Sequence, residues 1–131
     1  MRVAGCGFQA TTPMLACAMD SSTPNDRAAI LAALAAAVPA DRIDTGTEAL
    51  ALAATDVFFE ASNLPIAIVQ PRSAAEVQSL VRAARAGAFH LAPRGAGLSY
   101  SEGYVPQDAR TVLVDLRAMD RIVEINAPDR Y

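Results

Sequence analysis

The sequence predicts an α+β fold in which a small, mostly parallel sheet is flanked by helices. Residues 66–69 and 112–114 are apolar runs of the kind found in strands that are covered on both faces of a parallel sheet. Between them, Ser73-Ala74-Ala75-Glu76 forms a capping box that opens a helix. A further short strand is expected at 89–92, so this part of the chain indicates a right-handed β-α-β unit.

A helical lead-in is expected over residues 23–60. Thr23 can cap a first helix with Pro24 at its first position, and Pro39 ends it. The apolar face of this helix is predicted to be Leu31, Leu34, Ala35 and Val38. A second, weaker helix is expected from about 48 to 58, with one face against the sheet. Asp56, near its end, is expected to be a capping or solvated carboxylate rather than a functional group.

The β-α-β unit and its pyrophosphate loop are expected to occupy residues 64–126. The helix should present Val77, Leu80, Val81 and Ala84 on one face, with Gly87 as its C-cap. A third strand at 111–114 is expected to end at Asp115, which caps the following turn. Residues 122–125 are a candidate fourth strand.

Composition excludes several classes of protein. The chain has 131 residues, 53% of them hydrophobic, and a formal net charge of −3, which is typical of one modest globular core and not of a nucleic-acid-binding protein. All its basic residues are arginines, so it contains no Walker-type or Schiff-base lysine. Cys6 and Cys17 are too few for a zinc site or a disulfide framework, and we expect no metal. Residues 1–22 are expected to be poorly ordered, with no membrane span and a cytoplasmic location.

The candidate ligand-binding residues lie in the stretch at 93–103. Gly95 and Gly97 allow positive φ angles and a close approach of backbone N–H groups to an anion. Arg94 either adds charge or holds the loop, and Ser99 adds a hydroxyl. The stretch leaves the C-terminal end of a strand, where open α/β sheets bind ligands. The chain has no plausible helix from 93 to 110, and a loop of that length is usually functional. We interpret it as a pyrophosphate loop with the binding residues Arg94, Gly95, Ala96, Gly97, Leu98, Ser99 and Tyr100.

A Rossmann nucleotide site is the main alternative. Residues 95–100 almost match its glycine fingerprint, and Asp115 lies about where the ribose-binding acid should be. The third glycine position, however, is Tyr100. The helix that should follow is also disfavoured by Gly103 and Pro106.

Several of these motifs, in this order, resemble the N-terminal half of the FAD-binding domain of the vanillyl-alcohol oxidase and p-cresol methylhydroxylase (PCMH-type) family. The resemblance covers roughly residues 45–131 and rests on 66–69, 71–77, 93–100 and 112–125. It implies a domain with two α+β lobes that grip FAD, with the 94–100 loop around the pyrophosphate. In such enzymes a separate C-terminal domain supplies the substrate-binding and catalytic residues.

Three positions bear on this resemblance. Family members that bind FAD covalently through this loop have histidine at the position of Leu98, so the resemblance implies FAD that is not covalently attached here. Glu102 stands where many relatives have glycine, which indicates either altered loop geometry or a solvent-facing carboxylate. The lone His90 is expected to be structural rather than a ligand.

The implied function is that of a flavin-dependent oxidoreductase that transfers hydride from an alcohol, hydroxy acid or similar small molecule to FAD. The length of the chain indicates a truncated domain, residues 23–131, which would bind FAD weakly or not at all and would be inactive alone. Residues 122–125 would then form an exposed edge. The alternative is a non-enzymatic module that binds a nucleotide or docks a partner at that edge. No pattern identifies the catalytic residues or the electron acceptor.

Overall fold

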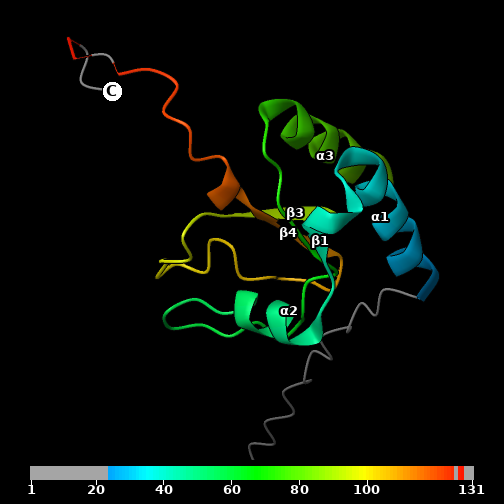
Figure 1. Ribbon diagram of the computed structural model, residues 1–131. Coiled ribbons are helices and arrows are strands. Elements are labelled where there is room, and N and C mark those ends of the chain that lie inside the picture. The colour runs from blue at the N-terminus through cyan, green and yellow to red at the C-terminus, as the bar shows by residue number, and fades with distance from the viewer. Residues whose placement is uncertain (1–23, 126, 129–131) are drawn as a thin grey trace, which may run out of the picture.

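The structure is a computed structural model that describes residues 24–125, 127 and 128 (Figure 1). Its elements, in chain order, are α1 (Pro24–Ala37), the 3-10 turn η1 (Ala40–Arg42), β1 (Ile43–Asp44), α2 (Thr47–Ala53), β2 (Ile68–Val69), α3 (Ala74–Gly87), β3 (His90–Arg94), β4 (Thr111–Asp115) and the 3-10 turn η2 (Leu116–Ala118).

The four strands form one sheet in the order β1-β2-β4-β3. β4 pairs in parallel with both β2 and β3, so the β-α-β unit and the mostly parallel sheet are confirmed. β1 adds a two-residue antiparallel strand at one edge, which the sequence did not indicate. β3 begins one residue later and ends two residues later than expected, at Arg94, opposite Asp115 of β4.

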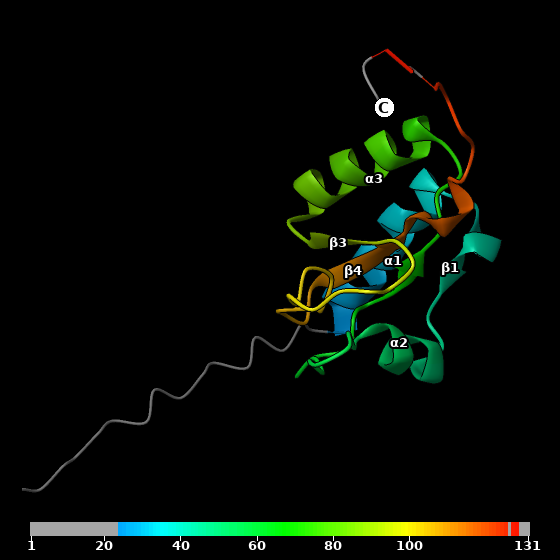
Figure 2. The ribbon, with the colours of Figure 1, turned by 90° about the vertical axis from the view of Figure 1, so that its left-hand side faces the viewer.

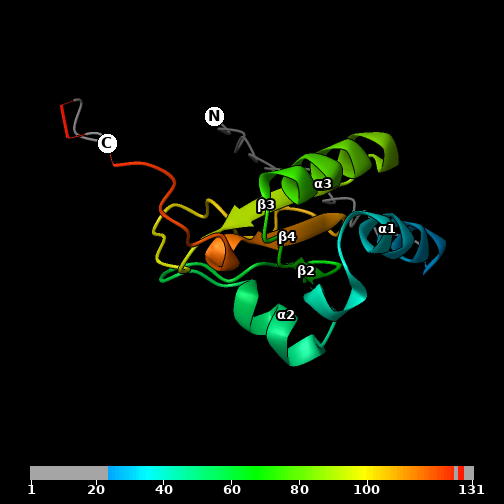
Figure 3. The same cartoon turned by 45° about the horizontal axis from the view of Figure 1, so that its top comes forward.

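Helices cover both faces of the sheet, so the described chain has three layers. In Figures 2 and 3, α3 and α2 lie on opposite sides of the strands. Because neighbouring residues of a strand point to opposite faces, the apolar strands supply two separate clusters. One joins the sheet to α1 and α3 through Leu34, Val69, Leu80, Val112 and Val114; the other joins it to α2 through Leu50, Ala53, Ile68 and Leu113.

Two helix predictions need correction. The buried positions of α1 are Ile30, Leu34 and Val38, four residues apart, whereas Ala35 is exposed. The predicted cap Thr23 lies outside the described residues. α2 ends at Ala53 instead of near residue 58, because the Asp56 carboxylate accepts hydrogen bonds from the N–H groups of Phe58 and Phe59 and closes a turn there.

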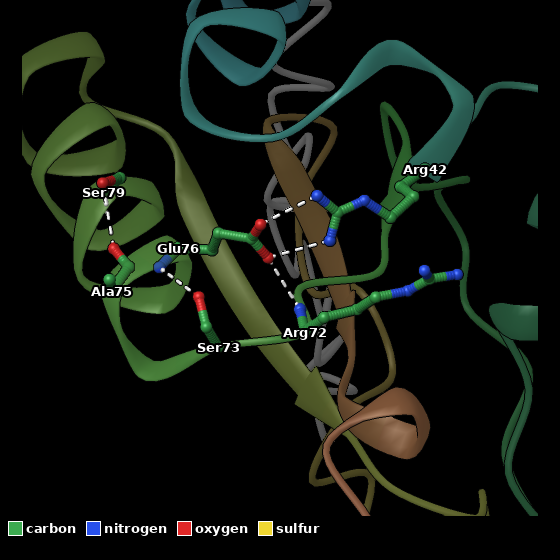
Figure 4. A network of polar contacts seen from close by, with 6 residues as sticks. All are labelled: Arg42, Arg72, Ser73, Ala75, Glu76 and Ser79. Carbon is green, nitrogen blue, oxygen red and sulfur yellow. Dashed lines mark hydrogen bonds and ion pairs between the residues drawn. The ribbon is translucent and has the colours of Figure 1, made fainter.

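The capping box of α3 is present and extends into an ion pair. The Ser73 hydroxyl accepts a hydrogen bond from the Glu76 N–H, and the Glu76 carboxylate accepts one from the Arg72 N–H. Both oxygens of Glu76 also bind the Arg42 guanidinium, at 2.8 and 2.9 Å (Figure 4). These contacts, that with Arg42 first, lower the pKa of Glu76 to about 2. The Arg42–Glu76 ion pair thus connects η1 to the start of α3.

The C-terminal end of α3 and the end of the chain also differ from expectation. Gly87 is the last helical residue, and the left-handed cap is Ala88, with φ +49°. Val81 is exposed rather than part of the core face. Residues 122–125 form no strand and leave Ile122, Val123 and Ile125 exposed. In the part of the chain that the structure describes, no helix is long and apolar enough to cross a membrane.

Candidate functional site: a loop of free backbone N–H groups

The segment from Arg94 to Gly103, here called the cradle loop, leaves the C-terminal end of β3 and returns toward β4 without forming a helix (Figure 1, yellow). The sheet fixes its start, because Arg94 is in register with Asp115. The loop therefore begins at the edge of a parallel sheet where the sequence placed a ligand site.

Of the two glycines, Gly97 alone adopts a backbone conformation that requires glycine. Gly97 has φ +84°, and a Cβ at this position would lie 2.5 Å from Nη2 of Arg94. Gly95 has no positive φ, and a Cβ there would meet no atom within 4 Å. The expectation that both glycines supply positive φ is therefore wrong for Gly95. Its missing side chain instead leaves the outer surface of the loop open.

Arg94 lies on the inner side of this turn. Its guanidinium carbon is 4.9 Å from the centre of the Tyr104 ring, a cation–π distance, and packs against Gly97. The hydroxyl of the buried Tyr104 donates a 2.6 Å hydrogen bond to the Gly97 carbonyl. Of the two sequence-based roles for Arg94, charge or loop support, these contacts favour support.

The cradle loop directs carbonyls inward and leaves N–H groups free. The Gly97 carbonyl is bound by Tyr104, and the Ser99 carbonyl accepts a hydrogen bond from the Val57 N–H at 3.3 Å. Among the described residues, the N–H groups of residues 96–100 have no acceptor. The Ser99 hydroxyl accepts from the Ser101 N–H and keeps its own hydrogen to donate. Such a set of donors without acceptors suits an anion.

A second loop, residues 55–60, lies against the cradle loop; the two are neighbours on the left of Figure 1. Its backbone closes through a bridge between Thr55 and Glu60. The Phe58 ring packs against the Tyr100 ring with 5.6 Å between ring centres and a 50° tilt. Both rings are largely exposed, so the predicted binding residue Tyr100 lies on the surface, against the 55–60 loop, and is not part of the core.

A cavity of about 170 Å³ lies between α2 and the C-terminal ends of the strands, and Arg94 and Asp115 are among the residues that line it.

Asp115 is buried, but Arg117 binds it at 2.6 Å and Gln70 at 3.3 Å. Burial alone would raise the pKa of Asp115, but the hydrogen bonds and charge of Arg117 lower it overall. Asp115 caps η2 through the Arg117 N–H, as expected. Because this carboxylate is paired and the described residues 95–110 form no helix, the geometry disfavours a Rossmann site.

His90 lies at the start of β3, the opposite end of the strand from the cradle loop. It is exposed, and its Nε2 is 3.1 Å from the Asp108 carboxylate. These contacts favour the structural role expected for His90 over a ligand role at the cradle loop. No cluster of potential metal ligands occurs within the described residues.

Known proteins match the chain over these elements. The FAD binding domain family matches residues 65–131. A curated relative, 1'-carboxy-chondrochloren decarboxylase of Chondromyces crocatus, is 34% identical over 112 residues, which are 85% of this chain and 20% of that protein.

Solved structures show the same fold. p-Cresol methylhydroxylase superposes with a TM-score of 0.67 at 18% identity, over 81% of this chain and 21% of that one. 4-Ethylphenol oxidase from Gulosibacter chungangensis gives 0.67 at 23% identity, over 83% and 22%. Wild-type BBE-like 1 from Physcomitrella patens gives 0.58 at 28% identity, over 76% and 21%.

The chain thus spans about a fifth of the length of these relatives. The family match begins at Pro65 and includes β2, α3, β3, the cradle loop and β4. The fold and the sequence agree: the chain belongs to the FAD-binding domain family, with the PCMH-type fold.

Proposed function

We propose that the cradle loop binds the pyrophosphate of FAD through the main-chain N–H groups of residues 96–100 and the Ser99 hydroxyl. The observation that carries this proposal is the row of donors without acceptors on the outside of a loop whose carbonyls are bound inside. Successive main-chain N–H groups without acceptors in the protein can converge on an anion, so a loop that holds them in this way is suited to the phosphate groups of a ligand.

The predicted binding residues have different tasks in this proposal. Gly95 leaves space for close approach, and Gly97 provides the left-handed turn. Arg94 supports the loop from inside and adds positive charge behind it. Leu98 is exposed beside the free N–H groups, and its aliphatic side chain offers no nucleophile to the flavin. We therefore propose that FAD is held without a covalent bond through this loop.

We further propose that the whole protein oxidises a small organic molecule, such as an alcohol or a hydroxy acid. When bound, FAD accepts the hydride. The residues described here bind and orient the cofactor, while the substrate-binding and catalytic residues come from the part of such enzymes that this chain does not cover. The names of two structural neighbours, an oxidase and a hydroxylase, support a redox enzyme with a small organic substrate.

A titration followed residue by residue tests the cradle loop directly. The ¹⁵N-labelled chain is titrated with inorganic pyrophosphate, ADP and FAD, because chemical shifts detect even millimolar binding. The amide resonances of residues 96–100 should move with all three ligands, and those of the exposed helix positions Gln78 and Arg82 should not. Of the two sequence-based expectations, weak binding and no binding, the N–H groups without acceptors favour weak binding, so shifts confined to another surface, or no shift at millimolar ligand, would contradict the proposal. Acid precipitation of the FAD complex should release all the flavin into the supernatant.

A second candidate function is a partner-docking module. It is supported by the exposed apolar side chains of Ile122, Val123 and Ile125, which lie in one extended segment. Such a module would use this segment and leave the cradle loop empty. The same titration separates the two, because a docking module predicts no response of residues 96–100 to any of the three ligands.

A further inference from the structure

Asp56 connects the cradle loop to a segment more than forty residues earlier in the chain. Its Oδ1 accepts hydrogen bonds from the N–H groups of Phe58 at 2.9 Å and Phe59 at 2.8 Å, which close the turn after α2. Its Oδ2 faces the other way and accepts a 3.0 Å hydrogen bond from the Glu102 N–H. One carboxylate therefore serves two loops, each with its own oxygen.

The residue that Asp56 holds is in an unfavourable conformation. Glu102 has φ +56°, in the left-handed region where a side chain other than glycine is strained. Besides the Asp56 contact, the 55–60 loop binds the Ser99 carbonyl through the Val57 N–H. The far half of the cradle loop is thus fixed at two points, one of which retains a strained backbone.

We propose that Asp56 is a positioning residue for FAD binding, which holds the cradle loop in its anion-binding shape through the Glu102 N–H. This inference rests on the proposed function of the loop. Burial by itself would raise the pKa of Asp56, but the N–H groups of Phe58, Phe59 and Glu102 lower it overall. The carboxylate is therefore ionised at neutral pH, where charge-assisted hydrogen bonds are stronger than neutral ones.

The substitution Asp56→Asn separates the two tasks of this side chain. An asparagine can still accept from Phe58 and Phe59 with its oxygen, but its NH₂ group would then face the Glu102 N–H, donor against donor. The turn should stay closed while the connection to the cradle loop is lost. We expect the Kd for ADP and FAD to rise on the order of tenfold, the cost of one charge-assisted hydrogen bond. The Glu102 amide should also exchange its hydrogen faster.

The control is Glu60→Gln, which removes the same charge from an exposed side chain of the same loop. Its Kd and the exchange rate of the Glu102 amide should match those of the original chain. Loss of a negative charge by itself favours anion binding, so a rise in Kd equal to that of Asp56→Asn would show that the loop responds to any substitution, and would overturn a role for Asp56 through Glu102.

A rescue experiment distinguishes positioning from general support of the fold. Glycine adopts φ +56° without strain, so Glu102→Gly should make the connection less necessary. In the Asp56→Asn background it should return the Kd to within roughly threefold of the original, about half of the lost hydrogen-bond energy. If Asp56 only closes the turn at Phe58 and Phe59, Glu102→Gly restores nothing, and the inference is wrong.

The exchange measurement needs no ligand, so it keeps the two proposals apart. If the original chain binds no anion at residues 96–100, the proposed function fails, whereas faster exchange at Glu102 in Asp56→Asn would still show that Asp56 positions the loop. If the original chain binds and Asp56→Asn binds equally well with unchanged exchange, the positioning role is overturned and the proposed function stands.

Discussion

Tyr104 binds both the guanidinium of Arg94 and the carbonyl of Gly97, so one buried ring fixes the two ends of the turn in the cradle loop. The ring face lies 4.9 Å from the guanidinium carbon, and the hydroxyl is 2.6 Å from the carbonyl oxygen. This arrangement binds the Gly97 carbonyl within the protein. The N–H groups of residues 96–100 have no acceptor among the described residues.

The two contacts of Tyr104 can be separated. Tyr104→Phe keeps the ring under Arg94 but removes the hydrogen bond to Gly97. We expect a loss of about 1 kcal/mol in the free energy of unfolding, because the carbonyl loses its donor, together with weaker binding of ADP. Chemical denaturation and the ¹⁵N titration measure the two effects.

The matched control is Tyr100→Phe, which removes a hydroxyl from an exposed ring of the same loop and should change the free energy of unfolding by less than about 0.5 kcal/mol. Equal losses in the two variants would mean that the Tyr104 hydroxyl does not hold Gly97.

The two glycines should respond differently to the same added methyl group. Gly97→Ala forces φ +84° on a residue with a side chain and places its Cβ against Arg94, so we expect it to cost about 1–2 kcal/mol or more. Gly95→Ala meets open space and should leave the free energy of unfolding nearly unchanged. Thermal unfolding compares them.

Ligand binding gives a second comparison of these variants. If the anion approaches Gly95 closely, Gly95→Ala should weaken ADP binding although the fold is intact. Unimpaired binding in this variant would place the anion elsewhere on the loop.

The parts of the fold that were predicted have strong local signals. The capping box at Ser73 fixes the start of α3, and continuous apolar runs mark strands that are covered on both faces. The glycine-rich loop followed from its place after a strand. Its free donors could not be predicted, because they depend on Tyr104 and Val57, which bind the carbonyls from other parts of the chain.

The failures have physical reasons of the same kind. β1 has two residues and exists because Ile43 and Asp44 pair with β2, a contact that leaves no periodic pattern. α2 stops early because one carboxylate, Asp56, captures two N–H groups. Residues 122–125 have three apolar side chains but no partner strand within the described residues, and a strand needs one.

The Arg42–Glu76 pair should make the free energy of unfolding fall as the pH is lowered. The folded state lowers the pKa of Glu76 from 4.5 to about 2, so its stabilising effect is complete above pH 4.5 and is lost as the pH falls toward 2. We expect the original chain to lose more stability across this window than Glu76→Gln does. Denaturation with urea at several pH values measures both slopes.

Arg42→Met removes the partner that contributes most to the lowered pKa of Glu76. The slope of its free energy of unfolding against pH should therefore approach that of Glu76→Gln. A slope as steep as that of the original chain would show that Arg72 and Ser73, not Arg42, stabilise the charged form of Glu76.

The cap of α3 offers a gain in stability. Ala88 adopts φ +49° and ψ +47° directly after the helix, a conformation that glycine adopts without strain. We expect Ala88→Gly to raise the free energy of unfolding by up to about 1 kcal/mol, since relief of left-handed strain exceeds the entropy that glycine adds to the unfolded chain. Ala86→Gly makes the same replacement two residues earlier, inside the helix, and should lower the free energy of unfolding by up to about 1 kcal/mol. Urea denaturation of the two variants should therefore give changes of opposite sign, and two losses would show that Ala88 is not held in the left-handed region in solution.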